Sequence, residues 1–175
     1  MDLKNFIRDV PDFPVEGVLF KDITPLILDV EAFACAVTSL GNEWMQSMPP
    51  DNIDAIVALD ARGFIFGSAL AFYYSIPLAI ARKKGKLPSK CVSQEYNLEY
   101  GTATLELHSD ALSPGMRALI VDDLLATGGT ALAACQLIEK VGAIVAGCAF
   151  VIELNALNGR ELLKNYEVQS LIQYD

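Results

Sequence analysis

Four short runs of apolar residues constrain the fold of this chain more than any other feature. They are Ala55–Leu59, Leu78–Ala81, Ala118–Val121 and Ala143–Ile152. Apolar and polar residues do not alternate within them, and unbroken apolar strands are typical of a parallel sheet that is covered on both faces. The 175 residues are enough to build one such sheet with its helices. We therefore expect a single domain over residues 1–175.

Segments with helical periodicity separate these runs. Apolar residues recur at helical spacing over residues 30–45, directly after Asp29, which is placed to act as an N-cap. Phe64–Tyr74 is apolar nearly all round, which predicts a helix buried on every side. A third helix has Ala131 on its inner face and is expected to end near Gly142. Strands alternating with helices predict a doubly wound α/β domain, with a mainly parallel sheet and helices on both faces.

The 36 residues between the second and third apolar runs (82–117) are too many for a simple crossover. They begin with the basic stretch RKKGKLP and later contain TATLELH, in which Ala103, Leu105 and Leu107 alternate with polar residues. This pattern predicts a loop followed by a half-exposed antiparallel strand. Because long loops in compact domains are commonly functional, we expect residues 83–108 to form a flexible flap over a binding site.

Composition excludes several classes of function. The formal net charge is −9, and an acidic surface disfavours nucleic acid or an anionic membrane as a partner. The four cysteines do not form a CxxC pattern and the chain has one histidine, so a zinc site is not expected. The apolar runs are shorter than a membrane span, and the first residues lack the apolar region of a secretion signal. These features predict a cytoplasmic protein without disulfides.

The stretch ALIVDDLLATGGT, residues 118–130, gives the clearest chemical information. An apolar strand is expected to end at Val121, and Asp122 and Asp123 follow it before a turn of small residues and a helix. The backbone N–H groups of such a turn, together with the helix N-terminus, can bind a phosphate. The residues predicted to form this cradle are Ala126, Thr127, Gly128, Gly129 and Thr130.

The two acids need a separate explanation, because carboxylates repel phosphate. Asp122 and Asp123 suit a ligand that also carries ribose hydroxyls, with Mg²⁺ held mainly through that ligand and near the two carboxylates. The stretch matches neither GxxxxGK[ST] nor GxGxxG, so the common nucleotide loops are not indicated. The residues therefore predict a site for a sugar phosphate.

This stretch resembles the phosphoribosyl-pyrophosphate signature of the type I phosphoribosyltransferases. The resemblance implies that Asp122 and Asp123 hold the ribose hydroxyls and that residues 126–130 hold the 5′-phosphate.

A second strand-turn-helix site is expected at residues 60–63, where the sequence reads DARG. The guanidinium of Arg62 offers a fixed fork of donors to pyrophosphate oxygens. The resembling family places its pyrophosphate loop here, although its loop commonly begins with glutamate rather than Asp60. The resemblance also implies further pyrophosphate contacts, some of them across the interface of a homodimer, from Arg82, Lys83, Lys86 and Tyr100.

Two other stretches bear on the base. Phe13-Pro14 and residues 17–23 resemble the base-binding hood of those family members that act on adenine, which assigns residues 1–28 to a hood. The resemblance implies that backbone groups around Leu19 and Lys21 read the purine edge. The position of Lys21 often holds arginine in the family. The resemblance further implies base packing by Phe20 and Leu154.

Residues 96–101, with the sequence YNLEYG, resemble the family's catalytic flap. The resemblance implies that Glu99 acts as acid or base on the purine and that Tyr100 helps to close the site. Arg62 and Glu99 are therefore the expected catalytic residues.

The resemblance extends from about Phe13 to Asp175 and includes the stretch NGRE at residues 158–161. It implies a purine salvage transferase that converts adenine and phosphoribosyl pyrophosphate to AMP and pyrophosphate with Mg²⁺. Two alternatives stay open. One is a related transferase for hypoxanthine, guanine or xanthine. The other is a regulator that senses phosphoribosyl pyrophosphate, which would need a nucleic-acid-binding arm or a basic face.

Overall fold

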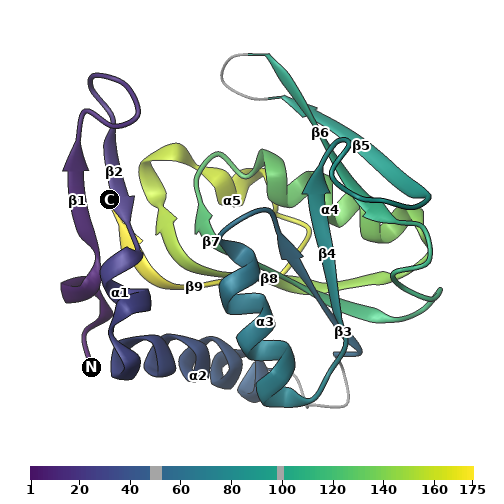
Figure 1. The fold of residues 1–175 in the computed structure, drawn as a ribbon, viewed down its shortest axis with the longest axis horizontal. Coiled ribbons are helices and arrows are strands. Elements are labelled where there is room, and N and C mark those ends of the chain that lie inside the picture. The colour runs from purple at the N-terminus through teal and green to yellow at the C-terminus, as the bar shows by residue number, and fades with distance from the viewer. Residues whose placement is uncertain (48–52, 98–100) are drawn as a thin grey trace.

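A seven-stranded sheet forms the centre of the computed structural model, which describes residues 1–47, 53–97 and 101–175 (Figure 1). The strand order is β5-β6-β4-β3-β7-β8-β9. The pairs β3–β4, β3–β7, β7–β8 and β8–β9 are parallel, which confirms the predicted mainly parallel sheet. The strands are β3 (Ala55–Leu59), β4 (Leu78–Lys83), β5 (Cys91–Asn97), β6 (Thr102–His108), β7 (Arg117–Leu125), β8 (Ile144–Leu154) and β9 (Val168–Tyr174).

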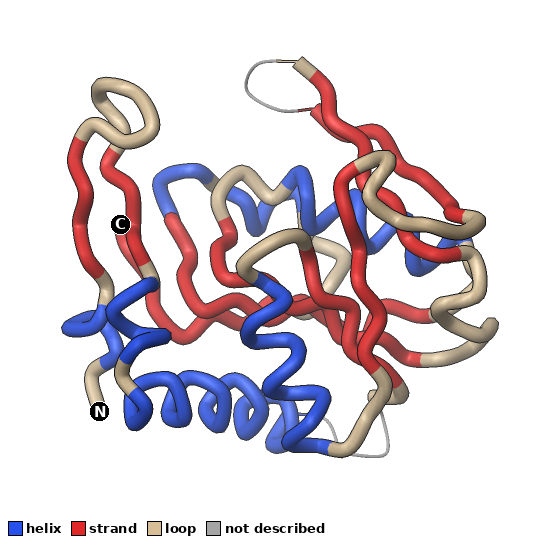
Figure 2. The backbone as a smooth tube through the Cα atoms, viewed as in Figure 1, coloured by secondary structure: helices blue, strands red, loops and turns tan. Residues whose placement is uncertain are grey.

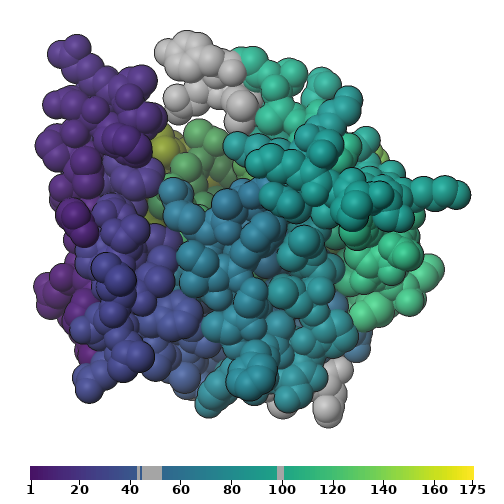
Figure 3. All heavy atoms as spheres, in the orientation of Figure 1, coloured from purple at the N-terminus to yellow at the C-terminus, as the bar shows by residue number. Residues whose placement is uncertain are grey.

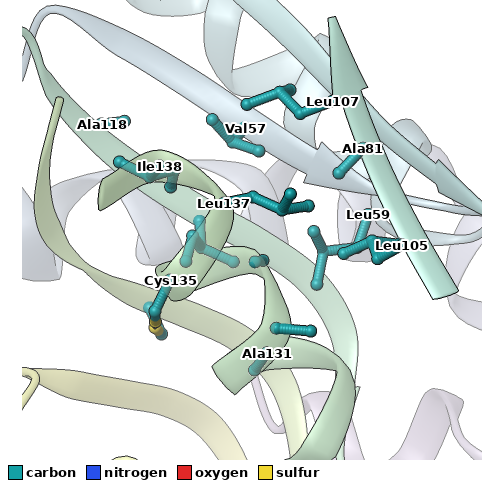
Figure 4. Close-up of a cluster of buried hydrophobic side chains, with 14 of the residues drawn as sticks. Val57, Leu59, Ala81, Leu105, Leu107, Ala118, Ala131, Cys135, Leu137 and Ile138 are labelled. Carbon is teal, nitrogen blue, oxygen red and sulfur yellow. The ribbon is translucent and has the colours of Figure 1, made fainter. Parts of the chain in front are cut away.

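Helices cover both faces of the sheet, as predicted (Figures 1 and 2). On one face lie α2 (Val30–Ser47) and α3 (Gly63–Tyr74), and on the other lies α4 (Gly129–Lys140). The two faces bury separate apolar clusters, and neighbouring residues of β3 divide between them. Ile56 belongs to the cluster under α2 and α3, whereas Val57 belongs to the cluster under α4. Figure 4 shows the second cluster, in which Leu137 of α4 faces the strands.

The predicted helix ends agree with the structure. The carboxylate of Asp29 accepts hydrogen bonds from the backbone N–H groups of Glu31 at 3.0 Å and Ala32 at 2.9 Å, so Asp29 caps α2. At the end of α4, Gly142 adopts a φ of +82° and donates its N–H to the carbonyl of Glu139. The chain therefore leaves α4 where the glycine permits a left-handed residue.

The prediction that residues 64–74 form a helix buried on every side is wrong. Helix α3 exposes Phe72 by 89% and Tyr73 by 59%, while Phe66 is fully buried. A helix that is apolar all round carries no periodic pattern, so the sequence could not indicate which face meets the core. Gly67 sets that face, because a Cβ there would lie 2.5 Å from the Cβ of Ala58 on β3.

Strand β7 does not end at Val121 as predicted but continues through Leu125. Asp122 pairs with Phe150 and Leu124 with Ile152 in the register with β8. The backbone of β7 can keep its sheet partner beyond the apolar run because pairing depends on backbone groups rather than on side-chain polarity. The two acids therefore lie on a strand and not in a loop.

The segment predicted as a loop and one antiparallel strand contains two strands. The predicted strand is β6, whose Leu105 and Leu107 are buried while Glu106 between them is partly exposed. The strand missed is β5, which pairs antiparallel with β6 along its whole length, while β6 pairs with β4. The sequence CVSQEYN of β5 is mostly polar and gave little indication of a strand.

A separate two-stranded sheet stands beside the C-terminal strand (Figure 1). It joins β1 (Arg8–Pro11) to β2 (Leu19–Asp22), between the short helices η1 (Leu3–Phe6) and α1 (Thr24–Leu28). The ring of Tyr174 on β9 connects it to the main sheet, because the Nζ atoms of Lys21 and Lys4 lie 4.0 and 5.2 Å from the ring centroid. The remaining helices are η3 (Asn155–Leu157) and α5 (Gly159–Leu162).

The helices of the described residues are all too short or too polar to cross a bilayer.

Candidate active site

A cleft of about 360 Å³ opens at the carboxyl ends of β3, β4 and β7. Ligands of open α/β sheets bind at this edge. In Figure 3 a hollow lies between the N-terminal hairpin β1–β2 (purple) and the segments drawn in teal. The cleft is lined by Asp60, Ala61, Arg62, Lys83, Tyr96, Leu105, Asp122, Asp123, Leu124 and Thr130.

The predicted phosphate cradle adjoins this cleft as a smaller pocket of about 80 Å³. All five predicted residues, 126–130, line it, and Thr130 and Asp122 line both spaces. Gly128 has a φ of +83° and immediately precedes α4. The first turn of a helix leaves backbone N–H groups without helical partners, and these groups favour an anion. The turn and the start of α4 can therefore offer backbone N–H groups to an anion in this pocket.

The acid pair lies at the bottom of the cleft. Asp123 is 6% exposed, and its backbone N–H donates to Oδ1 of Asp122 at 2.9 Å. Removal from water, and then the negative charge of Asp123, raise the pKa of Asp122 well above its ordinary value. Two carboxylates this close are stabilised by donor groups or by a cation placed between them.

Arg62 supplies part of that positive charge. Its Nε donates to Oδ2 of Asp123 at 2.5 Å, and its guanidinium carbon lies 5.3 Å from the ring centroid of Phe20. Arg62 thus connects the turn after β3 with β7 and with the N-terminal hairpin. Gly63 permits this approach, because a Cβ there would lie 2.7 Å from the carbonyl oxygen of Val121.

The basic residues predicted to bind pyrophosphate divide into two groups. Nε of Arg82 donates to Oδ2 of Asp60 at 3.3 Å, and Nζ of Lys86 lies 3.9 Å from the same oxygen. The side chain of Asp60 is 6% exposed, so this carboxylate balances two of the cations from inside the fold. Lys83 lines the cleft directly.

The residues expected to bind the base lie on the hairpin β1–β2 and at the end of β8. The rings of Phe20 and Phe13 are 5.1 Å apart in an edge-to-face contact. Lys21 places its Nζ 2.6 Å from Oδ1 of Asp9, so its side chain is already paired. Leu19 is half-exposed, and Leu154 pairs with Tyr174 at the end of the sheet.

Two expected site residues, Glu99 and Tyr100, lie outside the described residues. Tyr96, Leu105 and Leu124 also line the cleft, and the sequence did not predict these three as site residues. Leu124 was detectable in principle, since it follows Asp122 by two positions on one strand and side chains two apart point to the same face. Tyr96 begins the stretch YNLEYG at residues 96–101.

Within residues 1–47, 53–97 and 101–175, the structure has no group of three or more His, Cys, Asp or Glu side chains that could hold a metal ion. Asp122 and Asp123 both line the cleft, and their carboxylate oxygens could share a metal ion with a ligand.

Comparison with known proteins places this geometry in a family. The model of the phosphoribosyl transferase domain matches residues 26–174. The chain belongs to the phosphoribosyl transferase family. The resemblance inferred from the sequence is thereby confirmed, and so is the fold.

Relatives that match nearly the whole chain indicate a more specific similarity within the phosphoribosyl transferases. An adenine phosphoribosyltransferase of Pseudothermotoga lettingae is 50% identical over 174 residues, covering 99% of this chain and 100% of the relative. The crystal structure of the adenine phosphoribosyltransferase of Thermoanaerobacter pseudethanolicus has a TM-score of 0.94 and 45% identity, covering 99% of this chain and 98% of that one.

The enzyme of Saccharomyces cerevisiae is also similar. Its structure was solved with D-2,5-dideoxy-2,5-imino-altritol 1,6-bisphosphate and adenine. It has a TM-score of 0.94 and 38% identity, and the match covers 97% of this chain and 96% of that one.

Proposed function

We propose that this phosphoribosyl transferase joins adenine to phosphoribosyl pyrophosphate and releases AMP and pyrophosphate, a reaction of purine salvage. The observation that carries the proposal is one cleft in which a backbone phosphate cradle, a paired acid site and an arginine meet. The full-length relatives named adenine phosphoribosyltransferases support adenine as the base.

The ribose phosphate fits the cradle end of the cleft. The N–H groups of residues 126–130 would bind the 5′-phosphate, and Thr130 lies where cradle and cleft meet. The carboxylates of Asp122 and Asp123 would then accept hydrogen bonds from the ribose hydroxyls. The hydrogen bonds donated by the sugar would offset the repulsion between the two carboxylates.

The base fits between the N-terminal hairpin and the end of β8. Phe20 offers a ring for stacking, and Leu154 offers an apolar contact on the opposite side. Because the side chain of Lys21 is paired with Asp9, we assign base recognition to the backbone around Leu19 and Lys21. Residues 1–28 would act as a hood and residues 83–108 as a flap that excludes water.

The chemistry requires charge stabilisation on the departing pyrophosphate. The bond from C1′ of the ribose to the pyrophosphate oxygen breaks as N9 of adenine bonds to C1′, through a state with oxocarbenium character. Arg62 and Lys83 line the cleft, and Arg82 and Lys86 could exchange Asp60 for pyrophosphate. Glu99 is our candidate to accept the proton that adenine N9 loses.

Mg²⁺ fits this site as a companion of the substrate. Bound with pyrophosphate, it would supply further positive charge to the leaving group. Asp122 and Asp123 would hold it together with substrate and water oxygens, which matches the preference of Mg²⁺ for oxygen ligands and for keeping several waters.

We also propose that the protein acts as a cytoplasmic homodimer. Exposed apolar side chains on α1, α2 and α3 support self-association, namely Leu28, Val30, Phe72 and Tyr73. The four cysteines are all free thiols, as is usual in a reducing compartment. Light scattering coupled to size exclusion tests the dimer, and a monomer at micromolar concentration would contradict it.

A pyrophosphate-release assay tests the proposed reaction. Purified protein is given phosphoribosyl pyrophosphate and Mg²⁺ with adenine, hypoxanthine, guanine or xanthine in turn. We expect release with adenine and loss of release when the metal is chelated. Release with hypoxanthine and none with adenine would overturn the choice of base.

A further inference from the structure

The phosphate cradle, residues 126–130, is in contact with a glycine from a distant segment of the chain. A Cβ on Gly159, the first residue of α5, would overlap the carbonyl oxygen of Ala126 and lie 3.1 Å from the backbone nitrogen of Gly128. A Cβ on Gly128 would likewise lie 2.5 Å from the carbonyl oxygen of Gly159. The two backbones touch with no space for a side chain on either. Gly159 is not among the residues that line the cradle, so the support comes from outside it.

The residue after this glycine anchors it to the sheet. Arg160 donates from Nε to Oε1 of Glu153 at 2.6 Å and from Nη2 to Oε2 at 2.8 Å, a two-pronged pair. Its Nη1 donates to the carbonyl of Val168 at 2.8 Å, and the hydroxyl of Ser170 donates to Glu153 at 2.6 Å. Arg160 therefore ties α5 to both β8 and β9.

Glu153 is a buried, charged residue on β8, paired with Leu125 at the edge of the cradle. It is 3% exposed, and burial alone would raise its pKa. The hydrogen bonds from Arg160 and Ser170 outweigh burial and hold the pKa of Glu153 below its ordinary value. Buried ion pairs add little stability over apolar replacements, but they can specify one arrangement of the groups they join.

Helix α5 needs such an anchor. It has four residues and follows Asn158, whose φ is +53°, so its own hydrogen bonds do little to fix its position. We propose that Arg160 is a positioning residue for the 5′-phosphate: its pair with Glu153 holds Gly159 against Gly128 and so fixes the cradle before the ligand arrives. This inference rests on the proposed function, because it takes the ribose phosphate as the ligand of the cradle.

The test compares binding of ribose 5-phosphate, by calorimetry, across variants of the full chain. Arg160→Met removes the charge, Arg160→Lys keeps it, and Glu153→Gln keeps the shape of its partner. The matched control is Tyr166→Phe, which loses a 2.9 Å hydrogen bond to Glu139 near the other end of α4. Melting temperature and circular dichroism are recorded for every variant.

We expect Arg160→Met to weaken ribose 5-phosphate binding and to raise the KM for phosphoribosyl pyrophosphate, each by about tenfold. The KM for adenine and kcat should stay near the wild-type values, because Arg160 pairs with Glu153, Val168 and Ser170 and not with a residue assigned to the base or the leaving group. Arg160→Lys should restore part of the affinity. Tyr166→Phe should lower the melting temperature without changing ribose 5-phosphate binding.

Gly159→Ala provides a second route to the same contact while the ion pair stays intact. Its methyl group would push against Ala126, so ribose 5-phosphate binding should weaken as in Arg160→Met. The double variant should be less affected than the sum of the two, since both act through one contact. If Arg160→Met does not fold, Gly159→Ala and Glu153→Gln decide the question.

Two results would overturn the inference: unchanged ribose 5-phosphate affinity in these folded variants, or equal losses in phosphate affinity, KM for adenine and kcat. Failure of the proposed function looks different. In that case the wild-type protein would not make AMP from adenine, while its ribose 5-phosphate binding would still depend on Arg160.

Discussion

The turns after β3 and β7 occupy equivalent places at one edge of the sheet, yet they are made of different groups. The turn at residues 60–63 presents charged side chains, with Arg62 joined to Asp123 and Asp60 joined to Arg82. The turn at residues 126–130 presents backbone and is fixed by glycines and by contact with Gly159. Contacts to a ligand can replace the ion pairs of the turn at residues 60–63. The backbone of the turn at residues 126–130, in contrast, already has its shape before a ligand binds.

This difference fits the two ends of the proposed substrate. The 5′-phosphate does not change during the reaction, so a rigid cradle suits it. The pyrophosphate gains charge and leaves, so movable cations suit it. Variants of each turn test whether the two turns differ in this way.

Arg62→Gln should have the largest effect. It removes a cation aimed at developing charge, and we expect kcat to fall by about 10²- to 10³-fold. Binding of ribose 5-phosphate should change much less, because the cradle is backbone. Steady-state kinetics and calorimetry separate the two quantities. Weaker ribose 5-phosphate binding with unchanged kcat would contradict the assignment of Arg62 to the pyrophosphate.

Gly128→Val should weaken ribose 5-phosphate binding by about 10²-fold, since its side chain would displace the loop that positions the ligand. Gly115→Val is the matched control. Gly115 has nearly the same φ, +84°, but a Cβ there meets nothing within 4 Å. Both variants should lose stability from the positive φ, and binding should fall in Gly128→Val alone. Normal binding by Gly128→Val would show that the cradle is not rigid.

Acid should weaken the support of the cradle through Glu153. Its folded pKa is below the ordinary value of 4.5, so its contribution to stability is present above 4.5 and is lost as the pH falls through the folded pKa. Glu153→Gln should therefore cost about 2 kcal/mol of unfolding free energy at neutral pH. The difference in unfolding free energy between Glu153→Gln and the wild type should shrink as the pH falls through the folded pKa of Glu153. Urea unfolding at a series of pH values measures it, and a difference that widens in acid would contradict the assignment.

Asp60→Asn should have the smallest effect. It removes the carboxylate that competes with pyrophosphate for Arg82 and Lys86, so pyrophosphate should inhibit about threefold more strongly. Added salt should reduce this gain, because the cations are partly exposed. Product-inhibition kinetics at two salt concentrations test both points. Weaker inhibition would mean that Asp60 positions these cations instead of competing for them.

The sequence predicted those parts of the molecule that depend on neighbouring residues. Unbroken apolar runs located β3, β4, β7 and β8, because a strand covered on both faces cannot carry polar side chains at alternate positions. Residues 126–130 were placed in the cradle because paired glycines before a helix are a local feature. The acid pair and the cradle residues that were predicted do line adjoining spaces.

Features that depend on distant residues could not be predicted. The pairing of Arg62 with Asp123 spans 61 positions, and local sequence does not indicate which of two neighbouring acids it meets. The contact between Gly128 and Gly159 likewise joins separate segments. Strand β5 takes its conformation from pairing with β6, and the exposed face of α3 was hidden by its uniform apolar sequence.

The ring of Tyr174 between Lys4 and Lys21 has a consequence for the order of events during synthesis. The hairpin β1–β2 leaves the ribosome long before β9, and until then it lacks the ring that attaches it to the main sheet. A nascent chain without β9 would have no fixed wall for the base, and Arg160 would lack the carbonyl of Val168 that helps it to hold the phosphate cradle. The protein would thus complete its two recognition elements together, when β9 joins the sheet.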